Sequence, residues 1–293
     1  MEQTLQELRS LTAHAQNRRT ETGIPRVAMV KGQIPEHQLA GIYEPMINLI
    51  LQGGKTINIA DNTLSFDPAS YFVMTVDVPA TGLVRQGGPG RPYLAVSLTL
   101  DPEILANLLI DLPPISRAGG GANMAYSVCP VTPELLDAWL RLLRLMRDPQ
   151  DIAALAPAYE REILYRVLQG PQGWLLRDIA TPDSTVSQIR RAIQTIRDHY
   201  AEPIAMEALA SVTAMGLSTF HRRFKAVTGM SPLQYQKQIR LLQARSLLVA
   251  GSGSATEIAF EVGYESPSQF SREYARAFGL PPAKDCARLR MAS

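Results

Sequence analysis

Two stretches near the end of the chain repeat one pattern: LASVTAMGLSTFHRRFK at residues 209–225 and IAFEVGYESPSQFSREYAR at residues 258–276. Each begins with an apolar residue and an alanine, passes Ala214 or Gly263, and continues into a segment with the motif aromatic-x-Arg-x-aromatic. Alanine lets two helices cross closely, and a small residue suits a tight turn between them. Each stretch therefore predicts a helix-turn-helix unit.

The second segment of each unit has an apolar and a polar face at helical spacing. The apolar face carries Phe220, Phe224 and Val227, and then Phe270, Tyr274 and Phe278. Side chains on the opposite face suit DNA, because Arg and Gln pair with base edges and Lys neutralises phosphate. The residues that we predict to contact DNA are Ser218, Thr219, His221, Arg222, Arg223, Lys225, Ser268, Gln269, Arg272 and Arg276.

A long helix is expected between the two units. Ser231-Pro232 predicts its cap and first turn, and it should run to about Val249. One side of this helix should carry Tyr235, Ile239, Leu242 and Ser246. If the helix separates the two reading segments by one turn of DNA, about 34 Å, both can enter adjacent major grooves. A plain helical bundle explains a single unit, but two units in phase favour DNA binding.

Charge is distributed unevenly along the 293 residues. Residues 1–183 contain 15 basic and 19 acidic side chains, a net charge of −4, whereas residues 184–293 contain 14 and 8, a net charge of +6. A positive domain suits a polyanion, because each cation near a phosphate releases counterions. Turn residues interrupt the helical pattern near residues 178–186, so we predict a linker there and two domains, 1–183 and 184–293.

The two units differ in charge. His221, Arg222, Arg223 and Lys225 cluster in the first unit, whereas Glu265 and Glu273 lie near the reading residues of the second. The first unit is therefore expected to bind DNA more strongly, and the second to extend or tune recognition.

The C-terminal motifs resemble a known family. The segment FHRRFKAVTGMSPLQYQKQIRLLQARSLL, followed by TEIAFEVGYESPSQFSREYARAFGLPP, is similar to the DNA-binding domain of the AraC/XylS transcription regulators over residues 187–284. This resemblance implies that bases are contacted by Ser218, His221, Arg222, Ser268, Gln269 and Arg272. The chain departs from the family at Gly216, where a serine cap is usual, and at residues 285–288, where an aromatic-Arg pair is common.

The N-terminal half reads as a β domain followed by helices. Short apolar runs at residues 46–51, 55–59, 71–76 and 93–100 alternate with Gly-, Asn- and Pro-containing turns, which predicts an antiparallel sandwich or barrel. Helical signals start at Asp101-Pro102, and amphipathic patterns follow at residues 133–146 and 152–168. The apolar stripe of residues 133–146 suits packing against the sheet of the same chain or a dimer interface equally well.

A second resemblance covers this half. Tyr43-Glu44-Pro45, residues 51–55, Asp67-Pro68, residues 77–79 and residues 98–102 resemble the AraC-type regulator N-terminal domain over residues 24–112. The resemblance implies a cupin-like antiparallel β-barrel with flanking helices. Together with a C-terminal all-α domain of two helix-turn-helix units joined by a long helix, it predicts an α+β chain. Ala60-Asp61-Asn62 replaces an expected glycine turn, and this change should affect one hairpin.

Few residues of the N-terminal half suggest chemistry. A metal-dependent cupin enzyme needs clustered histidines, and only His14 and His37 precede the linker, so we expect no metal site, no cofactor and no enzyme activity. His37, next to Glu36, reads as a surface residue. Cys129 is a candidate reactive thiol for an electrophilic effector, but a small buried hydrophobe is the favoured interpretation.

These features predict a sequence-specific DNA-binding transcription factor of the AraC family, controlled by a small-molecule effector in the N-terminal barrel. The alternatives are a cupin-type enzyme with an accessory DNA-binding domain and an architectural DNA-binding protein without effector. Double-stranded promoter or operator DNA, RNA polymerase and a second copy of the chain are the expected partners. No membrane partner is expected, and the polar start of the chain and the absence of a long apolar run predict a cytoplasmic, nucleoid-associated protein.

Overall fold

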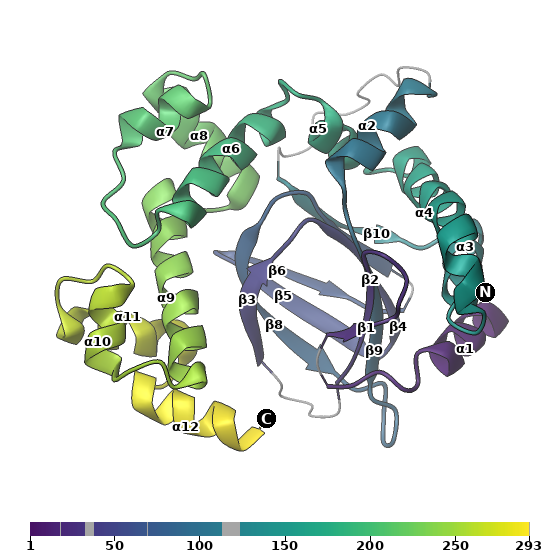
Figure 1. Ribbon diagram of the computed structural model, residues 1–293, viewed down its shortest axis with the longest axis horizontal. Helices are drawn as coiled ribbons and strands as arrows, with labels where there is room; N and C mark the ends of the chain where they lie inside the picture. The colour runs from purple at the N-terminus through teal and green to yellow at the C-terminus, as the bar shows by residue number, and fades with distance from the viewer. Residues whose placement is uncertain (18, 33–37, 69, 113–123, 293) are drawn as a thin grey trace. The chain divides into compact units, whose positions relative to one another are not determined.

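The computed structural model describes residues 1–17, 19–32, 38–68, 70–112 and 124–292 (Figure 1). The chain forms two compact units. The first comprises Met1–Ser187 with Ala226–Gly229, and the second comprises Gln188–Lys225 with Met230–Ser293. All described strands lie in the first unit, and the described elements of the second unit are helices, so the predicted α+β class is confirmed.

The strands of the first unit form two antiparallel sheets. A six-stranded sheet has the order β1-β2-β9-β4-β7-β10, and a four-stranded sheet has the order β3-β8-β5-β6. The strands are β1 (Thr20–Glu21), β2 (Val27–Gly32), β3 (Gln38–Tyr43), β4 (Met46–Gln52), β5 (Gly54–Ile59), β6 (Asn62–Phe66), β7 (Ser70–Met74), β8 (Val78–Arg85), β9 (Tyr93–Thr99) and β10 (Tyr126–Pro130). Among the described residues the two sheets are not joined into one closed barrel.

Local sequence signals located some strands and turns correctly. The predicted runs correspond to β4, β5, β7 and β9, whereas the other described strands were not predicted as runs. The β5–β6 hairpin turns at Ala60, which adopts a left-handed backbone (φ 49°) where a glycine is the usual residue. Gly53 turns the chain from β4 to β5 with φ 78°, and a Cβ there would lie 2.3 Å from the carbonyl oxygen of Arg85. This position therefore requires glycine.

The helices predicted to follow the strands are present. The helices of the first unit are α1 (Glu2–Leu11), α2 (Pro102–Ile110), α3 (Pro133–Arg144), the 3₁₀ turn η1 (Pro149–Asp151), α4 (Ile152–Gln169) and α5 (Gly173–Ala180). The Asp101 carboxylate caps α2 by accepting from the backbone N–H of Glu103 at 2.9 Å, as its sequence predicts. Helix α5 was not predicted, and it occupies part of the expected linker, so only Thr181–Ser184 separate it from the next helix.

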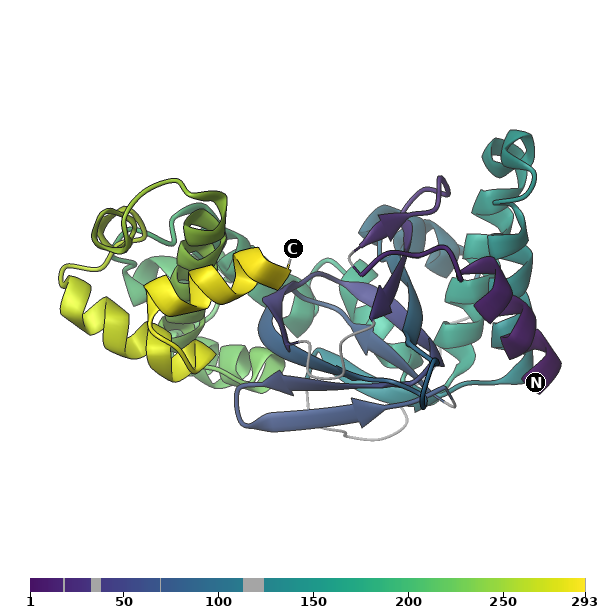
Figure 2. The same cartoon turned by 90° about the horizontal axis from the view of Figure 1, so that it is seen from below.

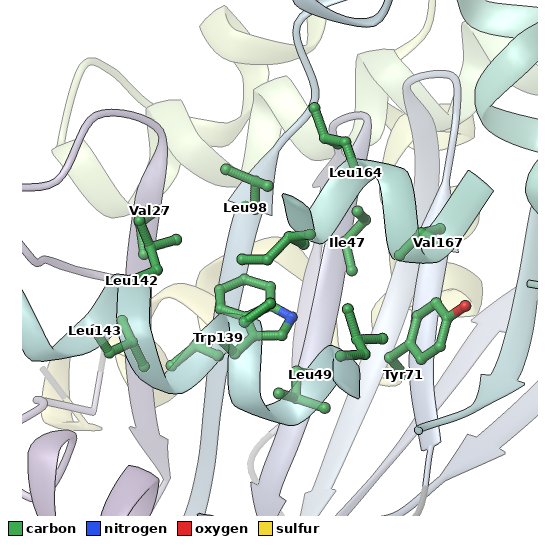
Figure 3. Close-up of a cluster of buried hydrophobic side chains, with 14 of the residues drawn as sticks. Val27, Ile47, Leu49, Tyr71, Leu98, Trp139, Leu142, Leu143, Leu164 and Val167 are labelled. Atoms are coloured by element: carbon green, nitrogen blue, oxygen red, sulfur yellow. The ribbon is translucent and has the colours of Figure 1, made fainter. Parts of the chain in front are cut away.

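The helices cover one face of the six-stranded sheet (Figures 1 and 2). Alternate residues of its strands, such as Ile47, Leu49 and Leu98, are fully buried and belong to the same apolar cluster as Trp139 of α3 and Leu164 of α4 (Figure 3). Burying each such aliphatic side chain contributes about 1.5–3 kcal/mol. The amphipathic helix at residues 133–146 therefore packs against its own sheet.

The second unit is built around one long helix. Its helices are α6 (Thr185–Asp198), α7 (Met206–Val212), α8 (Leu217–Thr228), α9 (Pro232–Ala250), α10 (Ala255–Glu261), α11 (Pro267–Phe278) and α12 (Pro282–Ala292). Ser231 and Gln234 form a capping box at the start of α9, which confirms the predicted start. Ser246, which was expected beside Tyr235 and Ile239 on one side of α9, is exposed, whereas those two are buried. No described helix is long and apolar enough to cross a bilayer.

The other face of the six-stranded sheet lines a cavity. This cavity has a volume of about 250 Å³, and both sheets contribute to its wall. Lys55 of β5 reaches it with 7% of its surface exposed, and its ammonium lies 4.6 Å from the ring centre of Tyr43. Burial lowers the pKa of Lys55 to about 8. The surroundings of Lys55 therefore disfavour its charged form.

We expect Lys55→Met to stabilise the first unit at pH 7. Below pH 8 the folded state must bury an ammonium that the unfolded chain hydrates, a cost of up to about 3 kcal/mol for a pKa lowered from 10.5 to about 8. This cost falls as the pH rises from 8 to 10.5, so the wild type should gain stability relative to the variant over that window.

Urea unfolding followed by tryptophan fluorescence measures this difference, since Trp139 and Trp174 both lie in the first unit. A stability difference that does not change with pH would contradict the assigned cause.

Candidate nucleic-acid interface

The first helix-turn-helix unit consists of α7 and α8. Leu209 and Ala210 of α7 are buried, and Phe220 and Phe224 of α8 have no exposed surface. The ring centres of Phe220 and Phe224 lie 5.6 Å apart, and Phe224 meets Tyr235 of α9 edge-to-face at the same distance. These contacts fix the inner face of α8 against the long helix.

The second helix-turn-helix unit repeats this arrangement with α10 and α11. Ile258 and Ala259 of α10 are fully buried. Three aromatic residues of α11 form a continuous buried row, with ring centres 5.5 Å apart for Phe270 and Tyr274 and 4.6 Å apart for Tyr274 and Phe278. The inner faces that the sequence predicts are therefore confirmed in both units.

The two turns share one backbone geometry. The N–H of Met215 donates to the carbonyl of Ala210, and the N–H of Tyr264 donates to the carbonyl of Ala259. Each bond spans a residue in the left-handed region, Ala214 (φ 55°) in the first turn and Gly263 (φ 90°) in the second. This is the Schellman arrangement that ends a helix.

The helix starts after the turns differ. Ser266 caps α11, because its hydroxyl accepts from the backbone N–H of Gln269 at 3.4 Å. Gly216 precedes α8 and has no side chain to do the same, and the space around a Cβ built there is open. The departure at Gly216 therefore leaves α8 without a side-chain cap at this residue.

The residues predicted to contact DNA gather on the outer faces of α8 and α11. Of these, Ser218, Arg222, Lys225, Ser268, Gln269, Arg272 and Arg276 are exposed, and Thr219, His221 and Arg223 are half-buried. Arg222, Lys225, Arg272 and Arg276 make no ion pair within the described parts of the chain. Their charges are therefore available to a polyanion, although the contacts themselves stay predictions.

On the outer face of α11, the carboxylate of Glu273 is held by neighbouring side chains. Glu273 accepts from the Tyr264 hydroxyl at 3.0 Å and from the Gln269 amide at 3.4 Å, and the Lys237 ammonium lies 3.5 Å away. Desolvation, followed by this contact with Glu273, raises the pKa of Tyr264 and keeps its hydroxyl protonated as the donor. One of the two N–H groups of the Gln269 amide is therefore engaged by Glu273, which restricts the orientation in which this amide can meet a base edge.

Arg240 connects several elements of the C-terminal compact unit, a role that the sequence pattern did not reveal. From α9 it donates to the carbonyl of Tyr200 at 2.7 Å, to those of Ala201 and Glu202 at 3.1 Å, and to that of Gly263 at 2.8 Å. These carbonyls lie after α6 and in the second turn. One side chain therefore links α9 to the segment after α6 and to the turn between α10 and α11.

The last helix is fixed by a buried ion pair. Asp285 has no exposed surface, and it accepts from Arg245 at 2.9 Å and from the Tyr274 hydroxyl at 3.0 Å. The guanidinium of Arg245 also lies 4.5 Å from the ring centre of Phe278. The departure from the family pattern at residues 285–288 therefore joins α12 to α9 and α11 through charge.

Cys129 is buried in the first unit with 1% of its surface exposed. Desolvation raises the pKa of its thiol, which disfavours the reactive thiolate. The reactive-thiol role stays a prediction that this environment does not favour. The other residue considered in this half, His37, lies outside the described residues.

Comparison with known proteins identifies the family. The model of the AraC-type transcriptional regulator N-terminus matches residues 23–175, more than half of the chain, and a helix-turn-helix domain model matches residues 209–287. The chain belongs to the AraC-type transcriptional regulators. The resemblance expected from the sequence is thereby confirmed for both halves.

Curated relatives of this AraC-type regulator match part of their length. An HTH-type transcriptional activator RhaS from Escherichia fergusonii is 37% identical over 100 residues, 34% of this chain and 36% of that protein. RhaS from Citrobacter koseri is 32% identical over 137 residues, 46% of this chain and 47% of that protein. The matched region thus spans about a third to a half of these relatives.

Solved structures share the fold of this AraC-type regulator. An apo ToxT variant from Vibrio cholerae has a TM-score of 0.59 at 12% identity and covers 92% of this chain and 98% of that chain. Wild-type ToxT from Vibrio cholerae with a bound unsaturated fatty acid has a TM-score of 0.54 at 11% identity and covers 89% and 93%. At these identities the likeness shows the fold.

We expect Gly216→Ser to stabilise the C-terminal compact unit by about a few tenths of a kcal/mol, because a serine hydroxyl can accept from a backbone N–H in the first turn of α8 as Ser266 does in α11. Far-UV circular dichroism during urea unfolding measures this gain. Gly216→Ala is the matched control, since it adds a Cβ without an acceptor. Equal stability of the two variants would contradict the capping explanation.

Substitutions in the two turns should have opposite effects. Ala214→Gly should stabilise by about 1 kcal/mol, because glycine relieves the left-handed backbone strain. Gly263→Ala should destabilise by about 2–4 kcal/mol, since it adds that strain and places a Cβ 2.0 Å from the Ala201 carbonyl oxygen.

Urea unfolding followed by circular dichroism measures both changes. Tryptophan fluorescence reports the N-terminal compact unit, whose stability should stay unchanged, and serves as the internal control. Shifts of equal sign would show that the two turns do not share one geometry.

Proposed function

We propose that this chain is a sequence-specific DNA-binding transcriptional regulator that reads DNA with α8 and α11. The observation that carries the proposal is the pair of helices whose inner faces are buried and whose outer faces carry exposed Arg222, Lys225, Arg272 and Arg276, which form no ion pair with described residues. Exposed arginines can bridge guanine O6 and N7, and lysine neutralises phosphate. The ten predicted residues named above form the proposed DNA-binding surface.

The proposal assigns separate roles to two domains, 1–183 and 184–293. The N-terminal domain holds a small-molecule effector, and the C-terminal domain binds promoter or operator DNA. Effector binding shifts the population of the chain that is competent to bind paired DNA sites. Support for an effector comes from the cavity of about 250 Å³ between the two sheets, and from ToxT, which has been solved with an unsaturated fatty acid.

The remaining partners follow from this role. The regulator acts in the cytoplasm on the nucleoid, contacts RNA polymerase, and pairs with a second copy of itself to bind two DNA sites. The curated relatives that match are transcriptional activators, which favours a regulator over a cupin-type enzyme with an accessory DNA-binding domain. An architectural DNA-binding protein is distinguished by its weak sequence preference at moderate salt.

Arginine substitutions should separate base reading from charge. We expect Arg222→Ala and Arg272→Ala to cost about 1–3 kcal/mol on the preferred operator and to relax base preference locally, because each removes a bidentate contact. Lys225→Ala should weaken all sequences alike and reduce the salt dependence by about one phosphate contact. Sites selected from random DNA, followed by fluorescence anisotropy at several salt concentrations, measure both quantities.

Two controls make the test specific. Arg222→Lys keeps the charge but loses the planar fork, so it should lose base preference with little change in salt dependence. Lys284→Ala removes an exposed charge from α12 and should leave sequence preference unchanged. Equal, sequence-independent losses from Arg222→Ala, Arg272→Ala and Lys225→Ala would reject the base-reading roles.

A further inference from the structure

The cavity of the first unit owes its space to small residues on one face of the six-stranded sheet. Gly32 of β2 and Ala95 and Ser97 of β9 line it, whereas their neighbours Leu94 and Val96 belong to the core under the helices. Alternate residues of a strand point to opposite faces, so the sheet packs large side chains against the helices and leaves space on the inner face. The resulting volume is about 250 Å³.

Three residues that line this cavity each carry a side-chain polar atom without a hydrogen-bond or ion-pair partner in the described part of the chain. Lys55 makes no hydrogen bond or ion pair there and contacts only the Tyr43 ring through its charge. The Tyr93 hydroxyl and the Asn48 side-chain oxygen also have no hydrogen-bond partner among the described residues. All three residues are more than nine-tenths buried. Buried polar groups are almost always paired, so three such groups around one cavity indicate a missing ligand.

The chemistry of these groups selects an anion with an apolar body. The Lys55 ammonium and the Tyr93 hydroxyl are donors, and together they suit the two oxygens of a carboxylate. One cation balances one negative charge, because the nearby Arg19 already pairs with Glu21 at 2.9 Å. Ile42, Met46 and Val84 supply apolar walls. The Asn48 oxygen accepts a hydrogen bond and favours a ligand that also carries a hydroxyl or N–H donor.

The volume limits the size of the ligand. An apolar protein cavity of about 150 Å³ holds one benzene molecule. The cavity of about 250 Å³ therefore accommodates one ring with a carboxylate and a small substituent.

We propose that the cavity between the two sheets binds a small monocarboxylic acid of about one ring in size, with its carboxylate on Lys55 and Tyr93. The inference rests on the proposed control by an effector and names the chemical class of that effector. Asn48 contributes selectivity for a ligand with a donor group. The cost of burying Lys55 is recovered when the carboxylate neutralises its ammonium.

Calorimetric titration of the full chain tests the proposal, with benzoate, phenylacetate and 4-hydroxybenzoate as probes and benzamide as the uncharged isostere. The wild type is expected to bind at least one of the carboxylates at least about tenfold more tightly than benzamide. Lys55→Met should abolish this preference for charge, and Tyr93→Phe should weaken carboxylate binding severalfold while keeping the ring.

Lys31→Met is the matched control. Lys31 lies on β2 and does not line the cavity, so the same substitution there should leave binding unchanged. Unfolding curves show whether each variant is folded. The proposal is overturned if none of the carboxylates binds at about 10 mM, if benzamide binds equally well, or if Lys55→Met retains the preference.

These measurements need no DNA, whereas the proposed DNA-binding role is tested with unliganded protein. A chain that reads operators through Arg222 and Arg272 but binds none of the probes would refute the ligand class alone. A chain that binds benzoate through Lys55 without sequence preference for DNA would refute the regulatory role and leave the cavity assignment standing.

Discussion

The buried aromatic rows of α8 and α11 determine which side chains can reach DNA. Phe220, Phe224, Phe270 and Tyr274 have no exposed surface, so one face of each helix is committed to the interior. In an α-helix this commitment fixes the direction of every other side chain, because the spacing is set by 3.6 residues per turn. Arg222 and Arg272 therefore point outward for the same reason that the aromatic residues point inward.

Features that depend on local sequence could be predicted. The starts of α2 and α9 followed from Asp101-Pro102 and Ser231-Pro232, since a cap and a proline act within one turn of the chain. Strands β4 and β9 were visible as apolar runs because both of their faces are largely buried. The predicted outer faces of α8 and α11 likewise required only helical periodicity. Each of these signals operates over fewer than about ten residues.

Features that depend on distant partners could not be predicted. Arg240 meets carbonyls 23 to 40 residues away, and Arg245 meets Asp285 at a separation of 40 residues. The polar groups of the cavity, Asn48, Lys55 and Tyr93, come from three strands in two sheets. Helix α5 lies between two turn-rich segments, and the breaks around it concealed its short apolar pattern. The sequence contains these residues but not their proximity.

The difference expected between the two helix-turn-helix units involves more than net charge. By charge alone, Glu273 should repel DNA phosphates. Its carboxylate, however, accepts a hydrogen bond from the Tyr264 hydroxyl and lies 3.5 Å from the Lys237 ammonium. Its repulsion of phosphate is therefore partly neutralised within the unit.

In the second helix-turn-helix unit, the Gln269 amide donates a hydrogen bond to Glu273. In the first helix-turn-helix unit, Arg222 and Lys225 form no ion pair with described residues. Contacts made through Arg222 and Lys225 would break no ion pair among the described residues. Under the proposed DNA-binding role, the bond from Gln269 to Glu273 would orient the Gln269 amide and so favour the base that matches this orientation. This is consistent with the proposal that the second helix-turn-helix unit extends or tunes recognition by the first.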